Sequence, residues 1–173
     1  MRRATALLAA IGLPPLAPGL GADESALPPD VFWSTVTAVQ EHVWPATGEA
    51  PAIADFNATP YLAAVLLDPG VAADERQFLS DGVTPLDAFA RERLKRPFYE
   101  ADTQARETLL RKIETSPVGR YWLSLIVYYV FEALLADPAY GGNPDGLGWR
   151  WLAHAPGFPR PPSPYPYREN GHA

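Results

Sequence analysis

The sequence contains no cysteine among its 173 residues, and its only methionine is Met1. The absence of cysteine excludes disulfides, thiolate nucleophiles, iron–sulfur clusters and cysteine-based zinc sites, as well as haem attachment through a Cys-x-x-Cys-His motif. Because methionine stands only at the first position, this side chain is also excluded as an axial haem ligand. The sequence therefore predicts no sulfur-based chemistry for this chain.

Basic residues are in the minority. The chain has 14 Lys and Arg against 20 Asp and Glu, which gives a net charge of −6 and an isoelectric point of about 5.0. A protein that binds nucleic acid needs a basic patch that displaces counterions from phosphates, so we expect no nucleic acid partner. The sequence also lacks a phosphate-binding Gly-Lys-Ser/Thr loop and a Gly-x-Gly-x-x-Gly turn between a strand and a helix, which argues against a bound nucleotide.

Proline is the residue in excess. It accounts for 20 of the 173 residues, more than twice its usual frequency of about 5%. Hydrophobic residues make up 47% of the chain, enough for one domain of this length to fold around a sizeable core. We therefore expect the prolines to lie between secondary-structure elements and in the tail.

The amino terminus has the layout of an export signal. Arg2 and Arg3 precede an uncharged apolar run over residues 4–13, and small residues follow at 19–22. The apolar run is too short to span a bilayer, which takes roughly 20 residues. The adjacent arginines also fit a twin-arginine signal, so both export routes stay open, as does an unstructured leader. We expect residues 1–29 to form an export signal and linker.

Proline positions and apolar spacing divide the following residues into helices. Phe32, Val36 and Val39 recur at steps of four and three, which is typical of one apolar face of a helix. Helix starts are predicted at residues suited to accept hydrogen bonds from first-turn amides, three of them followed by proline: Asp30, Thr59, Thr84 (with Asp87 as an approximate capping box) and Ser116. The predicted helices span residues 30–44, 60–67, 71–80, 84–96, 101–115 and 116–136.

The last of these helices is apolar nearly all round. Between Arg120 and Glu132, the only small polar residue is Ser124. We exclude a membrane span because the two charged residues bracket only residues 121–131, which leaves a central core helix or one that also lies against a partner protein. No period-two pattern of comparable length appears. The predicted fold is an all-α single domain of about five or six helices over residues 30–158.

After the long helix the chain is expected to be irregular. Residues 139–148 are dense in turn formers. Residues 156–167 hold six prolines and are expected to extend as polyproline II, and residues 159–173 form a proline-rich tail. The aromatic residues of this segment fit either a loop packed on the long helix or a protein interface. They are Tyr140, Trp149, Trp151 and Phe158.

Candidate metal ligands and catalytic residues are few. His42 with Glu41 offers two ligands, but adjacent helical residues point about 100° apart and no third ligand is evident, so a partly exposed helix histidine is favoured. For His154, a packing role in its loop is favoured over chemistry. No serine lies in a Gly-x-Ser-x-Gly turn. We predict no catalytic residue in this chain.

Three oxygen-bearing side chains, Asp137, Asn143 and Asp145, lie within a nine-residue loop and raise the question of calcium. Their spacing does not fit the twelve-residue EF-hand loop. The favoured interpretation is structural: Asp137 receives backbone amides, Asn143 forms an Asx-turn, and Asp145 with Gly146 makes a tight turn. No metal site and no cofactor are predicted in this chain.

The same loop carries a family resemblance. Residues 137–143 (DPAYGGN), with Gly146, Gly148-Trp149 and Pro156-Gly157 after them, resemble the carboxy-terminal signature of the gluconate 2-dehydrogenase subunit 3 family. The resemblance covers residues 31–158 and is most specific over 137–149. Upstream it includes the helix end at Trp44-Pro45 and the run from Phe78 through Leu86 to Phe98.

The resemblance implies a non-catalytic small subunit of an exported, periplasmic, membrane-associated dehydrogenase that oxidises a sugar acid, a sugar or another alcohol. Its expected partners are a large FAD-dependent flavoprotein, which the small subunit escorts during export or maturation, and a multihaem cytochrome c. FAD and haem c are expected in those partners. The residues expected to bind a partner are Asp137, Tyr140, Gly141, Gly142, Asn143, Trp149, Trp151 and Phe158.

Two alternatives from other classes stay open. One is a stand-alone metal-assisted hydrolase that uses Asp137, Asp145 and His154. The other is a structural helical protein that associates with copies of itself through Trp149 and Trp151.

Overall fold

The described chain folds as a succession of α-helices, as its prolines and apolar spacing predict. The computed structural model describes residues 30–158; the expected export signal (1–29) and proline-rich tail (159–173) lie outside the described residues. Within the described part there is no strand, which confirms the all-α prediction. The longer helices are α2 (Asp30–Val43), α3 (Ala58–Leu67), α4 (Ala73–Asp81), α5 (Val83–Leu94), α6 (Thr103–Glu114) and α7 (Pro117–Leu135). Shorter elements are the 3₁₀ turns η2 (Phe98–Glu100), η3 (Pro138–Tyr140) and η4 (Pro144–Gly146), and the five-residue helix α8 (Leu147–Trp151).

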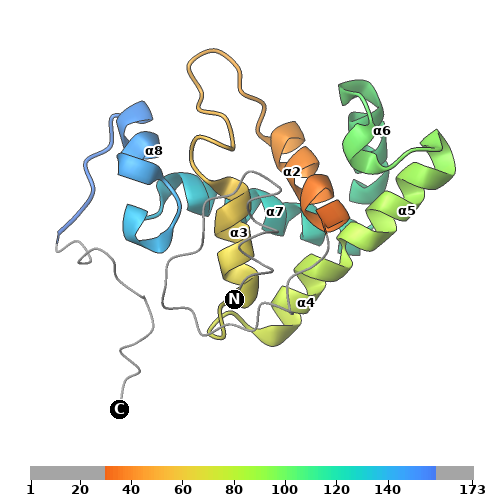
Figure 1. Ribbon diagram of the computed structural model, residues 1–173, viewed down its shortest axis with the longest axis horizontal. Coiled ribbons are helices and arrows are strands. Elements are labelled where there is room, and N and C mark those ends of the chain that lie inside the picture. Colours follow the sequence, from red (N-terminus) through yellow and green to blue (C-terminus); the bar gives the residue numbers. More distant parts are fainter. Residues whose placement is uncertain (1–29, 159–173) are drawn as a thin grey trace.

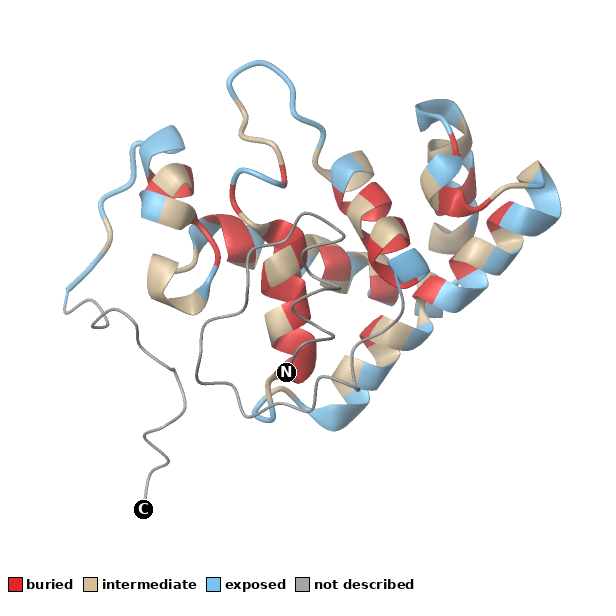
Figure 2. Ribbon diagram, viewed as in Figure 1, coloured by how far each residue is buried: buried red, intermediate tan, exposed pale blue. Residues whose placement is uncertain are grey.

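The long helix α7 is the centre of the fold. It contacts α2, α3, α4, α6 and α8, and in Figure 1 it runs behind α2 and α3. Its buried residues recur at steps of three and four and include Trp122, Ile126, Val130 and Leu134. Figure 2 shows buried residues concentrated where α2, α3 and α7 meet. The predicted central core helix is therefore confirmed.

The first helix, α2, presents its predicted apolar face to this core. Phe32, Val36 and Val39 are buried, and α2 also buries one long polar side chain, Gln40. Its amide oxygen accepts a hydrogen bond from the hydroxyl of Thr59 at 2.6 Å, and its nitrogen donates to the carbonyl of Ala58 at 3.3 Å. Because buried polar groups need partners, this pairing fixes how α2 lies against the start of α3.

Of the three predicted caps that are followed by proline, only the one at the start of α7 behaves as expected. The hydroxyl of Ser116 accepts a hydrogen bond from the amide of Gly119 at 3.0 Å, with Pro117 as the first helical residue. The cap predicted at Thr84 is wrong, because Gly82 has a helical conformation (φ −68°, ψ −22°) and links α4 to α5 directly. No free first-turn amides are then left for Thr84 to satisfy.

Two further local predictions are also wrong. The start of α3 is at Ala58, so Thr59 lies inside the helix, where its hydroxyl binds Gln40 instead of capping. Asp87 does not complete a capping box: its carboxylate accepts from the amide of Phe98 at 2.9 Å and pairs with Arg91 at 2.7 Å. In both cases a tertiary contact takes the side chain that the local pattern assigned to a helix end.

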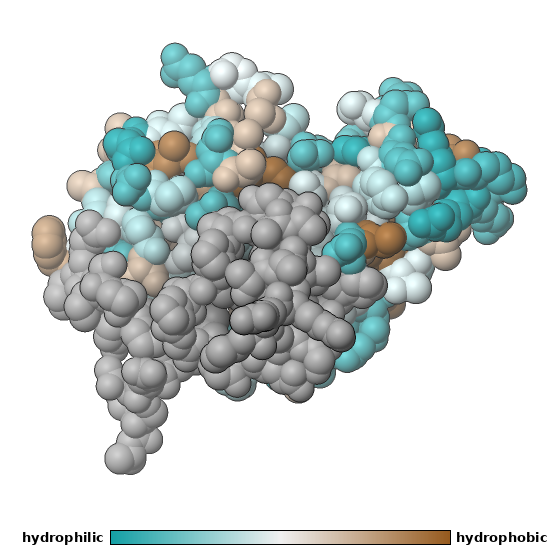
Figure 3. All heavy atoms as spheres, in the orientation of Figure 1, coloured by the Kyte–Doolittle hydropathy of each residue, from teal (hydrophilic) through white to brown (hydrophobic). Residues whose placement is uncertain are grey.

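The end of the molecule formed by α5 and α6 is mainly hydrophilic (Figure 3). It lies opposite α8 in the view of Figure 1. Charged side chains pair there within single helices, as Arg91 does with Asp87 on α5 and Arg111 with Glu107 on α6, both at 2.7 Å. This end therefore offers a solvated surface, in contrast to the α7–α8 end described below.

The cap of α7 gives a test of the fold on a single helix. Ser116→Ala removes the acceptor for the Gly119 amide and should lower the free energy of unfolding by about 1 kcal/mol. Ser124→Ala, at an exposed interior position of the same helix, should leave stability unchanged or raise it slightly, since alanine has the higher helix propensity. Urea unfolding followed by circular dichroism measures both. Equal effects of the two substitutions would contradict the assigned cap.

Candidate functional site

The segment after α7 is held against the end of that helix by one buried side chain, Asn143. Its amide nitrogen donates to the carbonyl of Ala136 at 2.9 Å, and its amide oxygen accepts from the backbone amide of Gly148 at 2.7 Å. Its own backbone amide donates to the carbonyl of Phe56 at 3.2 Å. Asn143 thus joins the end of α7, the start of α8 and the loop before α3. The bonds of its side chain to Ala136 and Gly148 replace the Asx-turn that the sequence predicted.

The glycines of the segment allow this close approach. A Cβ atom at Gly142 would lie 2.5 Å from the carbonyl oxygen of Ala133, and one at Gly148 would lie 2.0 Å from that of Leu134. Both distances are far below contact, so the segment lies directly on the backbone of α7 only because these residues lack a side chain. The tight turn predicted at Asp145 and Gly146 is confirmed, since both have positive φ values, 54° and 70°.

The remaining members of the signature loop also make internal contacts. The carboxylate of Asp137 accepts from the amide of Ala139 at 3.0 Å and caps η3, which confirms its predicted structural role. The carbonyl of Gly141 accepts from the side chain of Asn57 at 3.2 Å. Tyr140 is partly buried against the core. These residues build and orient the loop.

The chain after the loop is not entirely irregular, as the sequence had suggested, but forms the short helix α8. Residues two apart in a helix point about 200° away from each other. Accordingly Trp149 is buried, and its indole nitrogen donates to the carbonyl of Leu135 at 2.8 Å, whereas Trp151 is 38% exposed. Helix α8 therefore uses one tryptophan as an anchor and presents the other on the surface.

The exposed tryptophan belongs to an aromatic cluster that spans three segments. The ring of Trp44, at the end of α2, meets the rings of Phe131 and Trp151 edge to face, with centroids 5.4 and 5.6 Å apart. A third edge contact joins Trp44 to the buried Phe56 at 6.1 Å. This cluster connects α8 to the surface of α7. Phe158, in contrast, is 90% exposed.

One surface feature was missed by sequence reasoning. Four large side chains of α7 are exposed on one face, at steps of seven, three and four, and we call them the α7 stripe: Tyr121, Tyr128, Phe131 and Leu135, with exposed fractions of 55, 56, 45 and 40%. The sequence did contain one sign of an exposed apolar face, since α7 is apolar on nearly all sides. Which of its faces stays uncovered depends on how the other helices pack.

Two open depressions lie on either side of Leu135. One has a volume of about 290 Å³ and the other about 330 Å³. The first is lined by Leu135, Trp149, Leu152 and His154, and the second by Tyr128, Phe131, Glu132, Leu135 and Ala136. Leu135, which lines both depressions, therefore connects Tyr128 and Phe131 of the α7 stripe with the flank of α8.

Two carboxylates lie near each other beside α7, and one of them, Glu132, lines the second depression. Glu132 on α7 accepts a hydrogen bond from the phenol of Tyr61, and Glu75 on α4 accepts one from the phenol of Tyr129. Burial and the nearby Glu75 raise the pKa of Glu132 above its ordinary value, although the bond from Tyr61 acts in the opposite direction. Burial and the carboxylates likewise raise the pKa of both phenols. Glu132 therefore carries its negative charge at a cost.

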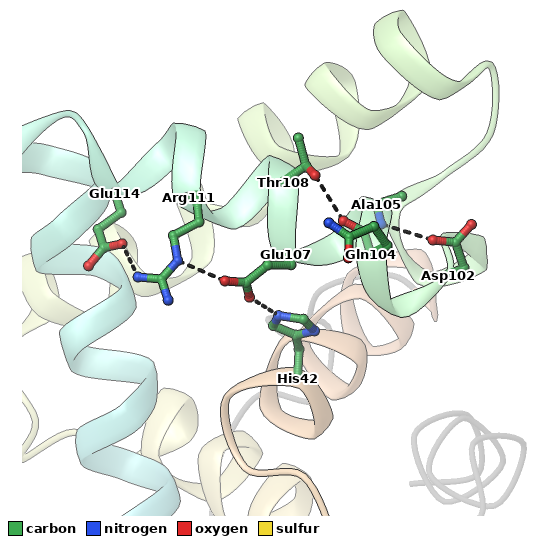
Figure 4. Close-up of polar contacts among 8 residues, drawn as sticks. All are labelled: His42, Asp102, Gln104, Ala105, Glu107, Thr108, Arg111 and Glu114. Carbon is green, nitrogen blue, oxygen red and sulfur yellow. Dashed lines mark hydrogen bonds and ion pairs between the residues drawn. The ribbon is translucent and has the colours of Figure 1, made fainter.

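His42 has a partner other than the metal considered from sequence (Figure 4). Its Nε2 lies 2.6 Å from Glu107 on α6, whose other oxygen accepts from Arg111 at 2.7 Å, and Arg111 also pairs with Glu114 at 3.0 Å. The bonds from His42 and Arg111 lower the pKa of Glu107. His42 thus joins α2 to α6.

No group of three or more His, Asp or Glu side chains lies close enough to hold a metal ion within residues 30–158. The structure does not bring together Asp137, Asp145 and His154, the residues of the hydrolase alternative. Asp137 acts as a cap and Asp145 lies in a turn. The described residues thus give the metal-assisted hydrolase no site.

Helix α7 is the one described helix long and apolar enough to cross a membrane by length and composition, with about a third of that stretch buried inside the protein. The eleven residues between Arg120 and Glu132 therefore do not exclude a membrane span by length, because the whole helix of 19 residues is long and apolar enough. The core helix of a soluble protein passes the same test. Here Trp122, Ile126 and Val130 of α7 are covered by the surrounding helices.

The fold and surface define an all-α protein with a loop fixed on its central helix and a hollowed apolar face. The family model for gluconate 2-dehydrogenase subunit 3 matches residues 32–157, more than half of the chain. The chain belongs to this family, which confirms the resemblance seen in the sequence. Searches of curated proteins and of solved structures returned no match.

The close approach of the loop to α7 can be tested at Gly148. The substitution Gly148→Ala places a methyl group against the carbonyl of Leu134 and should lower the free energy of unfolding by about 1–3 kcal/mol. It should also shift the tryptophan fluorescence of Trp149 to longer wavelength as α8 lifts. Gly157→Ala, where nothing lies within 4 Å, serves as the matched control and should change neither. A fully stable Gly148→Ala protein would contradict this packing.

The charge at Glu132 predicts a pH dependence. A carboxyl whose pKa is raised by folding destabilises the folded state as the pH rises through its titration range, because the unfolded chain ionises more readily. Glu132→Gln should therefore raise the melting temperature relative to the native chain more at pH 7 than at pH 4. Glu107→Gln is the control with the opposite sign, since folding lowers that pKa. Thermal unfolding at pH 4 and pH 7 measures both variants. A lower melting temperature of Glu132→Gln than of the native chain at pH 7 would contradict the raised pKa of Glu132.

Proposed function

We propose that this chain is the non-catalytic small subunit of an exported, FAD-dependent dehydrogenase of sugar acids, sugars or other alcohols. In this proposal it binds the large flavoprotein subunit and assists its export or maturation in the periplasm. FAD resides in the large subunit, and a multihaem cytochrome c subunit that carries haem c passes electrons to the membrane. Membership of the gluconate 2-dehydrogenase subunit 3 family supports a place in such a dehydrogenase complex.

The observation that carries the proposal is the set of large apolar side chains left exposed at the α7–α8 end, formed by the α7 stripe, Trp151 and Leu152. Soluble proteins rarely leave a large apolar patch uncovered unless it binds something. Tryptophan and tyrosine are the side chains most enriched at the energetic centres of protein interfaces. Three aromatic rings meet here, those of Trp44, Phe131 and Trp151, and a fourth, Tyr128, is exposed on α7 nearby.

The anchoring of the loop supports a binding role on energetic grounds. Asn143 and Trp149 hold α8 through hydrogen bonds to backbone groups of residues 135, 136 and 148. A surface already fixed in this way loses little conformational entropy when a partner binds. Most of the predicted site residues thus make contacts inside the chain, and two are exposed, Trp151 next to the α7 stripe and Phe158 further along the chain.

Self-association, the second candidate function, has less support. Trp149, one of its two predicted contact residues, is only 9% exposed and uses its indole nitrogen inside the chain. Trp151 is the only one of the pair on the surface. Light scattering of the purified chain decides this point, because a monomer excludes the self-associating protein.

The proposal predicts what happens when the chain and the large flavoprotein subunit of the same organism are produced together. Omission of the chain should abolish or strongly reduce the exported, FAD-loaded flavoprotein, and an affinity tag on the chain should recover the flavoprotein. Trp151→Ala should weaken the complex at least about tenfold, as expected for an interface centre. Val31→Ala, at an apolar side chain of similar exposure on α2, should not. Undiminished secretion of active flavoprotein without the chain would refute the proposal.

A further inference from the structure

The α7 stripe carries one charge. Between Tyr121 and Leu135, Glu132 is the only charged residue of α7, and it lines the larger depression together with Tyr128 and Phe131. An isolated carboxylate in an apolar wall is costly unless it is paired. Its presence on the exposed apolar face of the central helix therefore calls for an explanation.

No contact among the described residues compensates the charge of Glu132. The neighbours that act on Glu132 are the phenol of Tyr61, which donates a hydrogen bond, and the carboxylate of Glu75, which repels it. Within the described part of the chain, neither Glu132 nor Glu75 forms an ion pair with a lysine, arginine or histidine. Among residues 30–158, the two carboxylates therefore form an acidic site beside α7 that has no basic partner.

The depressions on either side of Leu135 are large enough to receive side chains. Their volumes of about 290 and 330 Å³ far exceed the roughly 15 Å³ that a single water molecule needs. One is bordered by Glu132 and the other by Trp149, Leu152 and His154. A segment that lies across Leu135 can place one side chain in each.

We propose that the α7 stripe binds an apolar segment of the large flavoprotein subunit that inserts a lysine or arginine beside Glu132 and an apolar side chain into the depression beyond Leu135. This inference rests on the proposed function and specifies which face and which partner chemistry it uses. The cation balances the charge of Glu132 and Glu75, and the apolar residues around it cover Tyr128, Phe131 and Leu135. Complementary charge of this kind fixes the register of an interface.

Two other occupants fit the surface less well. An anionic lipid surface would be repelled by Glu132 and Glu75, and a carboxylate is costly to place against hydrocarbon. A second copy of the chain paired about a two-fold axis would use the same patch on both sides. It would bring acidic sites together in a protein whose net charge is already −6. A basic, apolar protein segment is the occupant that the charges favour.

Substitutions on the stripe test the inference with the co-produced large flavoprotein subunit as the probe. Glu132→Gln should weaken the complex about tenfold, Glu132→Lys should weaken it more, and Leu135→Ser should weaken it through lost apolar contact. Glu92→Gln, at an exposed carboxylate on α5, is the matched control and should bind as the native chain does. Glu132→Gln should at the same time stabilise the isolated chain at pH 7. A purely structural role would weaken the complex and the chain together.

The absence of cysteine makes a direct test of the partner chemistry straightforward. Leu135→Cys introduces the only thiol of the chain, so a photo-activated cross-linker attached there reports what lies on the stripe. The expected product is a peptide of the flavoprotein that contains lysine or arginine among apolar residues. Glu92→Cys, labelled in the same way, should give no such product.

The outcomes separate the two proposals. A complex that forms normally with Glu132→Lys and Leu135→Ser overturns this inference and leaves the proposed function standing. Cross-links to lipid, to a second copy of the chain, or to a flavoprotein peptide without a basic residue overturn it as well. If the native chain forms no complex with the flavoprotein, the proposed function fails, and this inference fails with it.

Discussion

The side chain of Asn143 is the interaction on which the functional surface depends. Helices leave their last carbonyls and first amides without partners, and burial of such groups is costly unless another group satisfies them. Asn143 satisfies the carbonyl of Ala136 after α7 and the amide of Gly148 in α8, and its own amide binds Phe56. Because glycine at positions 142 and 148 brings the backbones together, these bonds can form. Trp151 then faces outward as a consequence.

Most of the fold could be predicted from the sequence, because apolar spacing and proline report on local structure. The helix ends that failed did so where a tertiary contact overrode the local pattern. Thr59 resembles a cap followed by proline, but its hydroxyl is needed by the buried Gln40. Helix α8 escaped prediction because its five residues are too short for a periodic signal and are held by contacts made elsewhere, by Asn143 and Trp149.

The candidate site was predictable in part. The residues of the signature loop stand out because glycine, asparagine and tryptophan at these positions are required by the packing on α7. The sequence does not show which of these residues anchor the loop and which are exposed. Trp149 and Trp151 look equivalent in the sequence, yet one is an anchor and the other is exposed. The α7 stripe is invisible for a related reason, since a helix that is apolar on all sides gives no sign of which side its neighbours cover.

In the proposed interface, an apolar face with an acidic residue beside it serves two needs: it limits non-specific contact before the partner binds, and it favours the correct partner. A wholly apolar α7 stripe would stick to any other apolar surface, including that of a second copy, because hydrophobic contact has little selectivity. In the proposed interface, the charge of Glu132, which lies near the carboxylate of Glu75, opposes such pairings. A partner that brings a cation removes this penalty and gains the apolar contact as well. In this proposal the charge of Glu132 stabilises neither the fold nor apolar contact with arbitrary surfaces. It selects which protein can cover the α7 stripe.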